Sequence, residues 1–219
     1  MENGIILIDK PAGLTSFGVV ARIRRVLSER AGKKVKVGHT GTLDPFATGL
    51  MILVVGKECR NAQIYTKHDK VYEATFRLGE KSTTGDPEGD IEKVSDIIPT
   101  QAAIETVLGS FRGKISQRPP IFSAIKINGK RAYKLARDGQ KVEIPTREIE
   151  VFSLEILSYE YPELKVRTHV SSGTYIRSLA VDIGEILGTG AYCSQLRRTK
   201  IKEYDINDAQ LLADFGILD

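Results

Sequence analysis

The 219-residue chain contains few cysteines and no long apolar run. Its two cysteines, Cys59 and Cys193, form no CxxC or other ligand spacing, which is typical of a protein in a reducing compartment. No segment reaches the roughly 18 uninterrupted apolar residues that a membrane span needs. The N-terminal stretch MENGIILIDKPAG holds a short apolar run after an acidic residue, which argues against a signal peptide. We therefore expect a cytoplasmic protein.

Common catalytic and metal-binding motifs are also missing. Between Gly32 and Gly38 there are five residues, and a histidine follows where a Walker loop has its lysine, so a phosphate loop of that type is excluded. His39, His68 and His169 lie far apart in the sequence and belong to no paired ligand motif. No GxSxG elbow supports a serine triad. We therefore expect neither a metal site nor a serine hydrolase.

The chain does have an ordinary globular composition and clustered positive charge. It is 41% hydrophobic and 27% charged, with a formal net charge of +4. A chain of this length can bury a core without disulfides or metals. Lys and Arg gather in three stretches: 22–36, 112–147 and 197–202. Such clusters are the footprint of a polyanion site, and solvated faces are the alternative explanation.

Hydrophobic periodicity predicts a mixture of strands and helices. A strand ends before Pro11, and a helix capped by Thr15 or Ser16 runs to Gly32. Further strands are predicted at GLMILVVG, KVYEATFRLGE, 148–157 and 164–170, and further helices at KECRNAQIYTKHD, after Thr100 and after SSGT. Because these elements follow one another without a βαβ rhythm, we expect an α+β fold around a largely antiparallel sheet.

The segment 111–145 has a looser pattern than the rest of the chain. It contains two adjacent prolines, an Asn128-Gly129 pair typical of a hairpin turn, and a short basic helix predicted near 131–137. We interpret it as an insertion or arm rich in positive charge.

The stretch VGHTGTLDPFATGLMILVVG places one carboxylate, Asp44, between a glycine-containing loop and an apolar strand. Gly38 and Gly41 permit tight turns and the close approach of a large ligand. Pro45 pushes Asp44 toward an extended backbone. By local pattern alone, a turn aspartate that bonds its own backbone is the commoner interpretation, and a reactive carboxylate on a rigid support is the alternative.

Arg177 has an unusual position for an arginine. It falls in the first turn of a predicted helix, where the helix dipole disfavours a cation by roughly 0.3–1 kcal/mol. A compensating anion is expected, either a side-chain carboxylate or a phosphate, unless the side chain reaches solvent. Tyr72 and Tyr175 fit either a core or a site, and Asp86 in TTGDPEG fits a turn. Together with the basic surface, these residues suit acid or nucleophilic chemistry on a nucleic acid without a cofactor.

At these residues the sequence resembles the bacterial tRNA pseudouridine synthase B family, which isomerises the uridine at tRNA position 55 in the T loop. The motif GHTGTLDPxATG is highly specific to this family and its close archaeal and eukaryotic rRNA-modifying relatives. The matching blocks occur in the family's order and cover most of 5–201: LIDKPAGLTSF, VGHTGTLDPFATGLMILVVG, KVYEATFRLGEKSTTGDPEG, QRPPIFSAIKINGKRAYKLARDGQKVEI, SSGTYIRSLAVDIGEILGTGAY and LRRTKI.

The resemblance implies a pseudouridine synthase fold, a mixed and mainly antiparallel sheet with flanking helices and a central RNA-binding cleft. It implies a single catalytic domain over 1–219. Asp44 matches the catalytic nucleophile, which would attack ribose C1′ or uracil C6; the sequence leaves both open. Tyr72 matches the tyrosine that stacks on the target base and serves as a base during isomerisation.

Other site residues also follow from the resemblance. Arg177 matches the arginine that pairs with the catalytic aspartate, and Tyr175 precedes it in the same GTYIR motif. His39 matches the histidine that packs into the T loop when the uridine flips, and Leu196 matches a leucine that lines the pocket.

The arm and the LRR block would contact the RNA backbone. The residues expected to do so are Lys130, Arg131, Lys134, Arg197 and Arg198. The expected partner is the T stem-loop of tRNA, bound by a monomer without a cofactor, a metal, a membrane or a protein partner.

Two features depart from the family pattern. Only about twenty residues follow the LRRT block, too few for the small C-terminal PUA domain that family members usually have, so none is expected. Lys202 and Tyr204 stand where a glycine and a phenylalanine often occur. Two other functions stay open: a tRNA-folding chaperone without catalysis, and the same chemistry on another RNA.

Overall fold

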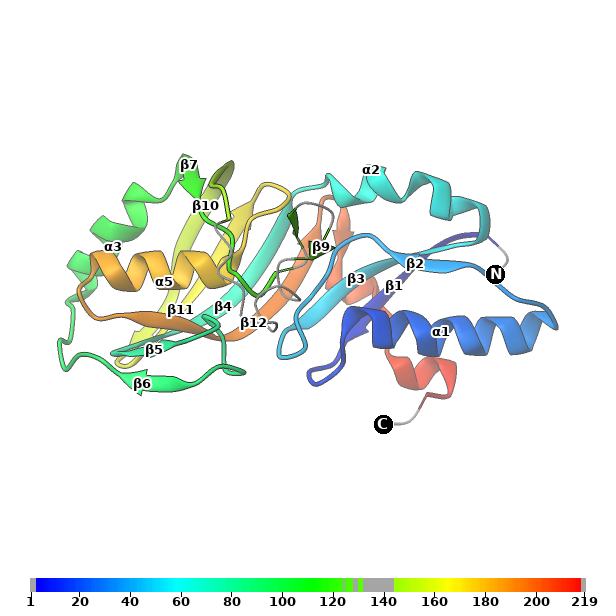
Figure 1. Cartoon of the computed structure of the whole chain (residues 1–219), viewed down its shortest axis with the longest axis horizontal. Coiled ribbons are helices and arrows are strands. Elements are labelled where there is room, and N and C mark those ends of the chain that lie inside the picture. The colour runs from blue at the N-terminus through cyan, green and yellow to red at the C-terminus, as the bar shows by residue number, and fades with distance from the viewer. Residues whose placement is uncertain (1–2, 124, 128–129, 132–143, 218–219) are drawn as a thin grey trace. The chain divides into compact units, whose positions relative to one another are not determined.

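The computed structural model describes residues 3–123, 125–127, 130–131 and 144–217 (Figure 1). The chain forms two compact units. The first unit comprises Met1–Glu73 and Leu196–Asp219, and the second comprises Ala74–Gln195. Strands β4 (Lys70–Leu78) and β12 (Ala191–Ile201) each begin in one unit and end in the other.

The first unit is built around strand β3 (Thr48–Val55). Strands β1 (Gly4–Lys10) and β2 (Val37–His39) pair with it antiparallel. Strand β12 pairs with it in parallel, with Arg198 opposite Gly49. The remaining elements of the unit are α1 (Ser16–Ala31), η1 (Gly56–Asn61), α2 (Ala62–Thr66), β13 (Tyr204–Asp205), η2 (Ile206–Asp208) and η3 (Leu212–Phe215).

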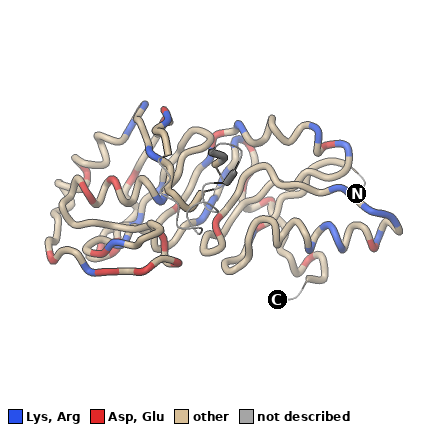
Figure 2. Tube along the Cα trace, viewed as in Figure 1, with Lys and Arg blue, Asp and Glu red and all other residues tan. Residues whose placement is uncertain are grey.

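Helix α1 begins and ends where the sequence predicts. The Thr15 hydroxyl accepts a hydrogen bond from the Gly18 N–H at 2.9 Å, which satisfies one of the free amides of the first turn. Gly32 ends the helix in the left-handed region at φ 61°. Its buried residues include Val19, Val20, Ile23 and Leu27. Lys and Arg positions, coloured blue, occur along this helix and the segment after it (Figure 2).

Strand β3 is buried on both faces, as its continuous apolar run predicts. Leu50 and Ile52 pack with Ile201 in a core cluster. Gly49 has φ 106°, and a Cβ there would lie 2.3 Å from the backbone oxygen of Arg198. Only glycine therefore lets β12 approach β3 closely enough to pair with it.

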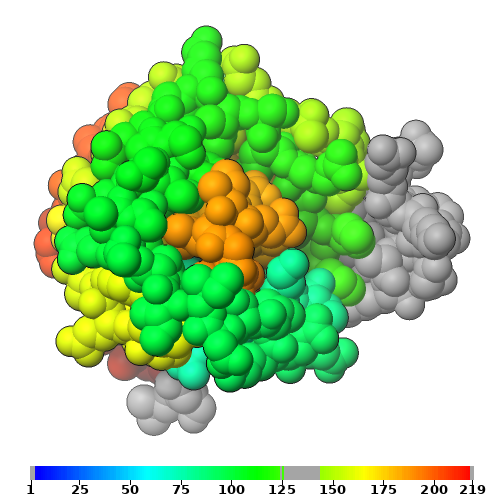
Figure 3. Space-filling model, turned by 90° about the vertical axis from the view of Figure 1, so that its left-hand side faces the viewer, coloured from blue at the N-terminus to red at the C-terminus, as the bar shows by residue number. Residues whose placement is uncertain are grey.

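The described residues of the second unit combine strands with two helices. Its strands are hydrogen-bonded in the order β4, β11 (Glu163–Val170), β10 (Arg147–Glu160) and β7 (Gly113–Gln117). Helices α3 (Gln101–Ser110) and α5 (Ile176–Ile186) lie on the same face of these strands (Figure 1). On one face of the space-filling view, atoms of α5 are framed by segments from earlier in the chain (Figure 3). β5 (Glu80–Ser82) and β6 (Ile91–Lys93) form a separate antiparallel pair.

Some local predictions were wrong in detail. The helix expected at KECRNAQIYTKHD is a 3₁₀ turn, η1, followed by only five α-helical residues in α2. Strand β10 is longer than the pattern indicated, because bulges near Val151 and Ile156 keep it paired to β11 while its alternation shifts.

The predicted arm is described only in part. β8 (Lys126–Ile127) pairs antiparallel with β9 (Lys130–Arg131), as a hairpin would. The Asn128-Gly129 turn and Lys134 lie outside the described residues, as does the predicted basic helix except for Arg131, which belongs to β9. The expected RNA contacts of the arm stay predictions.

The predicted fold class is confirmed as a mixed α/β architecture with mostly antiparallel strand pairing. The single domain and the central RNA-binding cleft stay predictions. Among the residues that the structure describes, no helix is both long enough and apolar enough to cross a membrane.

Candidate functional site

Asp44 lies in the loop between β2 and β3, directly before the buried strand, as predicted. Its side chain is half-buried, and its backbone oxygen accepts a hydrogen bond from the Ala47 N–H at 3.1 Å. Asp44 thus opens a turn that its backbone carbonyl closes. A bond from its side chain to its own backbone, and a reactive role for that side chain, both stay predictions.

Ser16 clamps the residue before Asp44 from the start of α1. Its hydroxyl accepts a hydrogen bond from the Leu43 N–H at 2.8 Å and donates one to the Leu43 oxygen at 2.9 Å. Ser16 is 2% exposed and Leu43 is 3% exposed. Both backbone groups of Leu43 are thus satisfied by one buried side chain, which restricts the position of the Asp44 backbone.

Lys10 holds the residue after Asp44. Its buried ammonium donates to the backbone oxygens of Pro45 at 3.1 Å, Leu14 at 2.6 Å and Pro11 at 2.8 Å. The Gly13 N–H donates to the same Pro45 oxygen at 2.8 Å. The segment DKPAG therefore supports the loop at Pro45, directly after Asp44, whereas Ser16 supports it at Leu43, directly before Asp44.

Arg198 supports the loop from β12. Its guanidinium donates to the Leu50 oxygen at 2.7 Å and to the Gly41 oxygen at 3.1 Å. The side chain is 1% exposed, so the predicted contact with RNA phosphates does not fit this residue. Leu196 and Arg198 alternate along β12 and are both buried, a period-2 pattern from which the burial could have been found.

A second buried cation lies beside Arg198. Lys70 donates to the backbone oxygens of Thr66, at 3.2 Å, and of His68. Burial, and then the positive charge of Arg198, lower the pKa of Lys70 to about 8. Tyr72, two residues further along β4, is 7% exposed, and its ring centroid lies 6.0 Å from the Arg198 guanidinium. Tyr72 is thus placed against a cation in the first unit.

Other predicted residues of the first unit are also placed. His39 ends β2 opposite Leu53 and is half-buried. Leu196 is 8% exposed on β12. Arg197 pairs with Asp9 at 2.7 Å and keeps 41% of its side chain exposed, so it can still meet a phosphate.

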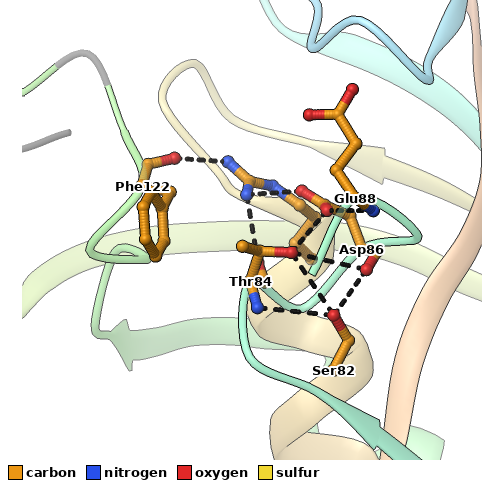
Figure 4. A network of polar contacts seen from close by, with 6 residues as sticks. Ser82, Thr84, Asp86, Glu88 and Phe122 are labelled. Carbon is orange, nitrogen blue, oxygen red and sulfur yellow. Dashed lines mark hydrogen bonds and ion pairs between the residues drawn. The ribbon is translucent and has the colours of Figure 1, made fainter. Parts of the chain in front are cut away.

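Arg177 forms a buried ion pair in the second unit. Its Nη1 lies 2.8 Å from Asp86 Oδ2, and each side chain is 4% exposed (Figure 4). Nη1 also donates to the Thr84 oxygen at 3.1 Å, and Nη2 donates to the Phe122 oxygen at 2.8 Å. The anion expected near this arginine is therefore a side-chain carboxylate. The predicted pairing of Arg177 with Asp44 stays a prediction.

Asp86 is held by its own turn. Its Oδ1 accepts hydrogen bonds from the Thr84 hydroxyl at 2.5 Å and the Glu88 N–H at 3.0 Å. The Ser82 hydroxyl donates to the Asp86 backbone oxygen at 2.5 Å (Figure 4). Sequence reasoning assigned Asp86 only to a turn, although the cation of Arg177 required a carboxylate and TTGDPEG offered one.

Tyr175 is fixed through its backbone and its ring. The Gln117 amide donates to the Tyr175 oxygen at 3.0 Å and accepts from the Tyr175 N–H at 2.8 Å. Gln117 is 0% exposed. The Arg147 guanidinium lies 4.9 Å from the ring centroid. No sequence signal pointed to Gln117 or Arg147, because both contacts join segments distant in the chain.

The predicted site residues divide between the units. Asp44, His39, Tyr72 and Leu196 belong to the first unit, and Tyr175 and Arg177 belong to the second. Across the described part of the chain, no three His, Cys, Asp or Glu residues gather in a group that could hold a metal ion.

Family models match this chain along most of its length. The model of the TruB family pseudouridylate synthase N-terminal domain matches residues 24–176. The model of the tRNA pseudouridylate synthase B C-terminal domain matches residues 177–216.

Individual relatives agree with the family models. The tRNA pseudouridine synthase B of Azoarcus sp. strain BH72 is 43% identical over 203 residues, which are 93% of this chain and 66% of that protein. The enzyme of the same name from Aquifex aeolicus is 44% identical over 97% of this chain and 73% of its own length. A chain in the crystal structure of a Cbf5-Nop10-Gar1 complex superposes with a TM-score of 0.73 at 34% identity, over 97% of this chain and 53% of that one. The present chain thus spans about two thirds of such relatives and about half of the structural neighbour.

Proposed function

Because the chain belongs to the TruB family of pseudouridylate synthases, we propose that it converts uridine 55 in the T loop of tRNA to pseudouridine, with Asp44 as the nucleophile. The observation that carries the proposal is the support of the Asp44 loop by three buried side chains. Ser16, Lys10 and Arg198 hold its backbone at Leu43, Pro45 and Gly41. A nucleophile acts efficiently when its position is fixed before the substrate arrives.

The reaction needs only groups that this chain supplies. The glycosidic N1–C1′ bond breaks, the uracil turns, a C5–C1′ bond forms, and the C5 proton is lost while N1 regains one. Nothing is oxidised or reduced, so the proposal includes no cofactor. The Asp44 carboxylate forms a temporary bond to the nucleotide, at ribose C1′ or uracil C6, and is released unchanged.

The base must first leave the RNA stack, which costs a few kcal/mol. Stacking on an aromatic side chain offsets about 1–3 kcal/mol of this cost. Tyr72, buried and backed by the Arg198 guanidinium, is the aromatic residue that we assign to the flipped base. His39 would fill the space that the base leaves, and Leu196 would line the pocket.

In the proposed function, Arg177 and Tyr175 are the residues that the second unit contributes. Asp86 holds the Arg177 guanidinium, and Gln117 holds the Tyr175 backbone. We further propose that the protein acts in the cytoplasm as a monomer and without a protein partner. The names of the relatives support tRNA as the substrate.

The test is the Asp44→Asn variant, assayed for pseudouridine at position 55 of a tRNA transcript. We expect the rate to fall by about 10⁴-fold or more while tRNA binding is retained, because the amide is not a nucleophile. Asp90→Asn, at an exposed loop aspartate, is the matched control and should keep wild-type activity. Full activity of Asp44→Asn would refute the assignment.

Assays of the wild-type protein distinguish the two other functions from the proposed one. A tRNA-folding chaperone would bind a T stem-loop transcript under single-turnover conditions and release it with its uridine unchanged. An enzyme for another RNA would leave position 55 unmodified. In cells that lack the protein, the pseudouridines that disappear would then lie in that other RNA.

A further inference from the structure

A basic pocket lies at the end of β3 away from Asp44. It has a volume of about 410 Å³, and five of the residues that line it are cations: Lys33, Lys34, Lys36, Lys57 and Arg60. All five are exposed, and the pocket belongs entirely to the first unit. Blue segments mark the loop after α1 and the nearby start of η1 (Figure 2).

The pocket has a fixed framework. The Gly56 N–H donates to the Lys36 oxygen at 2.8 Å, and the Lys57 N–H donates to Asn3 Oδ1 at 2.7 Å. Next to Lys36, β2 pairs with β3 through Val37 and Val55. Lys36 and Lys57 therefore project from backbone that these hydrogen bonds and the adjacent strand pairing hold in place.

Four of the five cations form no ion pair within the described part of the protein. None of the ion pairs there involves Lys34, Lys36, Lys57 or Arg60. Every residue that lines the pocket is Asn, Lys, Arg, Val or Gly, so the lining offers neither a carboxylate nor an aromatic ring. Such a surface attracts phosphate groups and offers no aromatic ring on which a base could stack.

The pocket is remote from the reacting nucleotide. β3 runs from Thr48, beside the Asp44 loop, to Val55, beside the pocket. Eight extended residues with a rise of about 3.3 Å each separate the two ends by about 25 Å. One nucleotide bound at Asp44 does not extend that far, so an anion in the pocket belongs to a different part of the bound molecule.

We propose that this pocket binds backbone phosphates of a helical segment of the RNA substrate, outside the T stem-loop. The inference rests on the proposed function, which brings a polyanion to the first unit. The contact does not depend on the RNA sequence, because the lining side chains interact with phosphate groups and not with bases. It positions a folded tRNA on the first unit.

The experiment compares two RNAs, a full-length tRNA transcript and an isolated T stem-loop hairpin. The triple variant Lys34→Gln, Lys36→Gln, Lys57→Gln should bind the full tRNA about 10-fold more weakly. The slope of log Kd against the logarithm of the salt concentration should fall by about 2–3, close to one for each lost phosphate contact. Binding of the hairpin should change less than 2-fold.

A matched control removes the same charge from the second unit. Lys93→Gln, Lys114→Gln, Lys165→Gln neutralises three exposed lysines there and should change the Kd for full tRNA less than 2-fold. An unchanged Kd of the pocket variant, an equal loss for the hairpin, or an equal loss in the control would each overturn the inference. Failure of the proposed function is seen separately, as wild-type protein that binds tRNA and leaves uridine 55 unchanged.

Discussion

The hydroxyl of Ser16 accepts a hydrogen bond from the N–H of Leu43 and donates one to its backbone oxygen, at 2.8 and 2.9 Å. The two residues are 27 positions apart and both are buried. Asp44 follows Leu43 directly. The start of a helix thus holds the loop that carries the proposed nucleophile.

Ser16→Ala should lower activity more than a cap substitution beside it does. The change leaves two buried backbone groups of Leu43 unsatisfied, at a cost of about 2–4 kcal/mol of unfolding free energy. We expect the single-turnover rate to fall about 10-fold or more in the folded protein, with tRNA affinity unchanged, because the loop loses its restraint.

Thr15→Ala is the control for this prediction. It removes the N-cap of α1, costs about 1 kcal/mol of stability, and leaves the Leu43 bonds in place. Equal single-turnover rates for Ser16→Ala and the wild type, measured where both are fully folded, would show that the clamp does not position Asp44.

Removing the charge of Asp86 should strongly destabilise the protein. Asp86→Asn takes away the carboxylate 2.8 Å from the Arg177 guanidinium, and both side chains are 4% exposed. Breaking a buried pair leaves a poorly compensated charge, so the free energy of unfolding should fall by about 3 kcal/mol or more. Denaturant unfolding of Asp86→Asn, Arg177→Gln and the double variant measures the coupling between the two.

An exposed ion pair gives the contrast. Lys93 and Asp96 interact with side chains that are 65% and 87% exposed, so Asp96→Asn should leave the free energy of unfolding nearly unchanged. Losses of similar size at Asp86 and Asp96 would contradict a special role for the buried pair.

Asp182 in α5 should make stability depend on pH. Burial, and then the negative charge of Glu185, raise the pKa of Asp182 to about 6 from its ordinary 3.8. Between these values the folded protein binds a proton that the unfolded chain has released, so this contribution to stability is present below pH 3.8 and is lost as pH rises through 6. Asp182→Asn should therefore match the wild type near pH 4 and be more stable than it at pH 7.5, by about 1 kcal/mol because solvent screens this partly exposed carboxyl group.

The Glu185→Gln variant checks the cause of the shift. It removes the second contribution to the raised pKa, so stability should fall over a narrower pH range than in the wild type. A stability difference between Asp182→Asn and the wild type that stays constant from pH 4 to 7.5 would refute the assignment to Asp182.

The sequence by itself determined the features that depend on neighbouring residues. Thr15 and Gly32 set the ends of α1, because capping and the left-handed conformation act within a turn of the helix. The apolar run before Gly56 determined a strand buried on both faces. The motif around Asp44 was also sufficient to indicate the family.

Only the tertiary structure decided which distant residues meet. Asp86 and Arg177 are 91 positions apart, and nothing in either local pattern names the other. Arg198, expected at the RNA, is instead buried against the oxygens of Leu50 and Gly41, because parallel pairing of β12 with β3 places it there. Local propensity extends over a few residues, whereas burial and charge pairing arise from contacts that exist only after the strands have assembled.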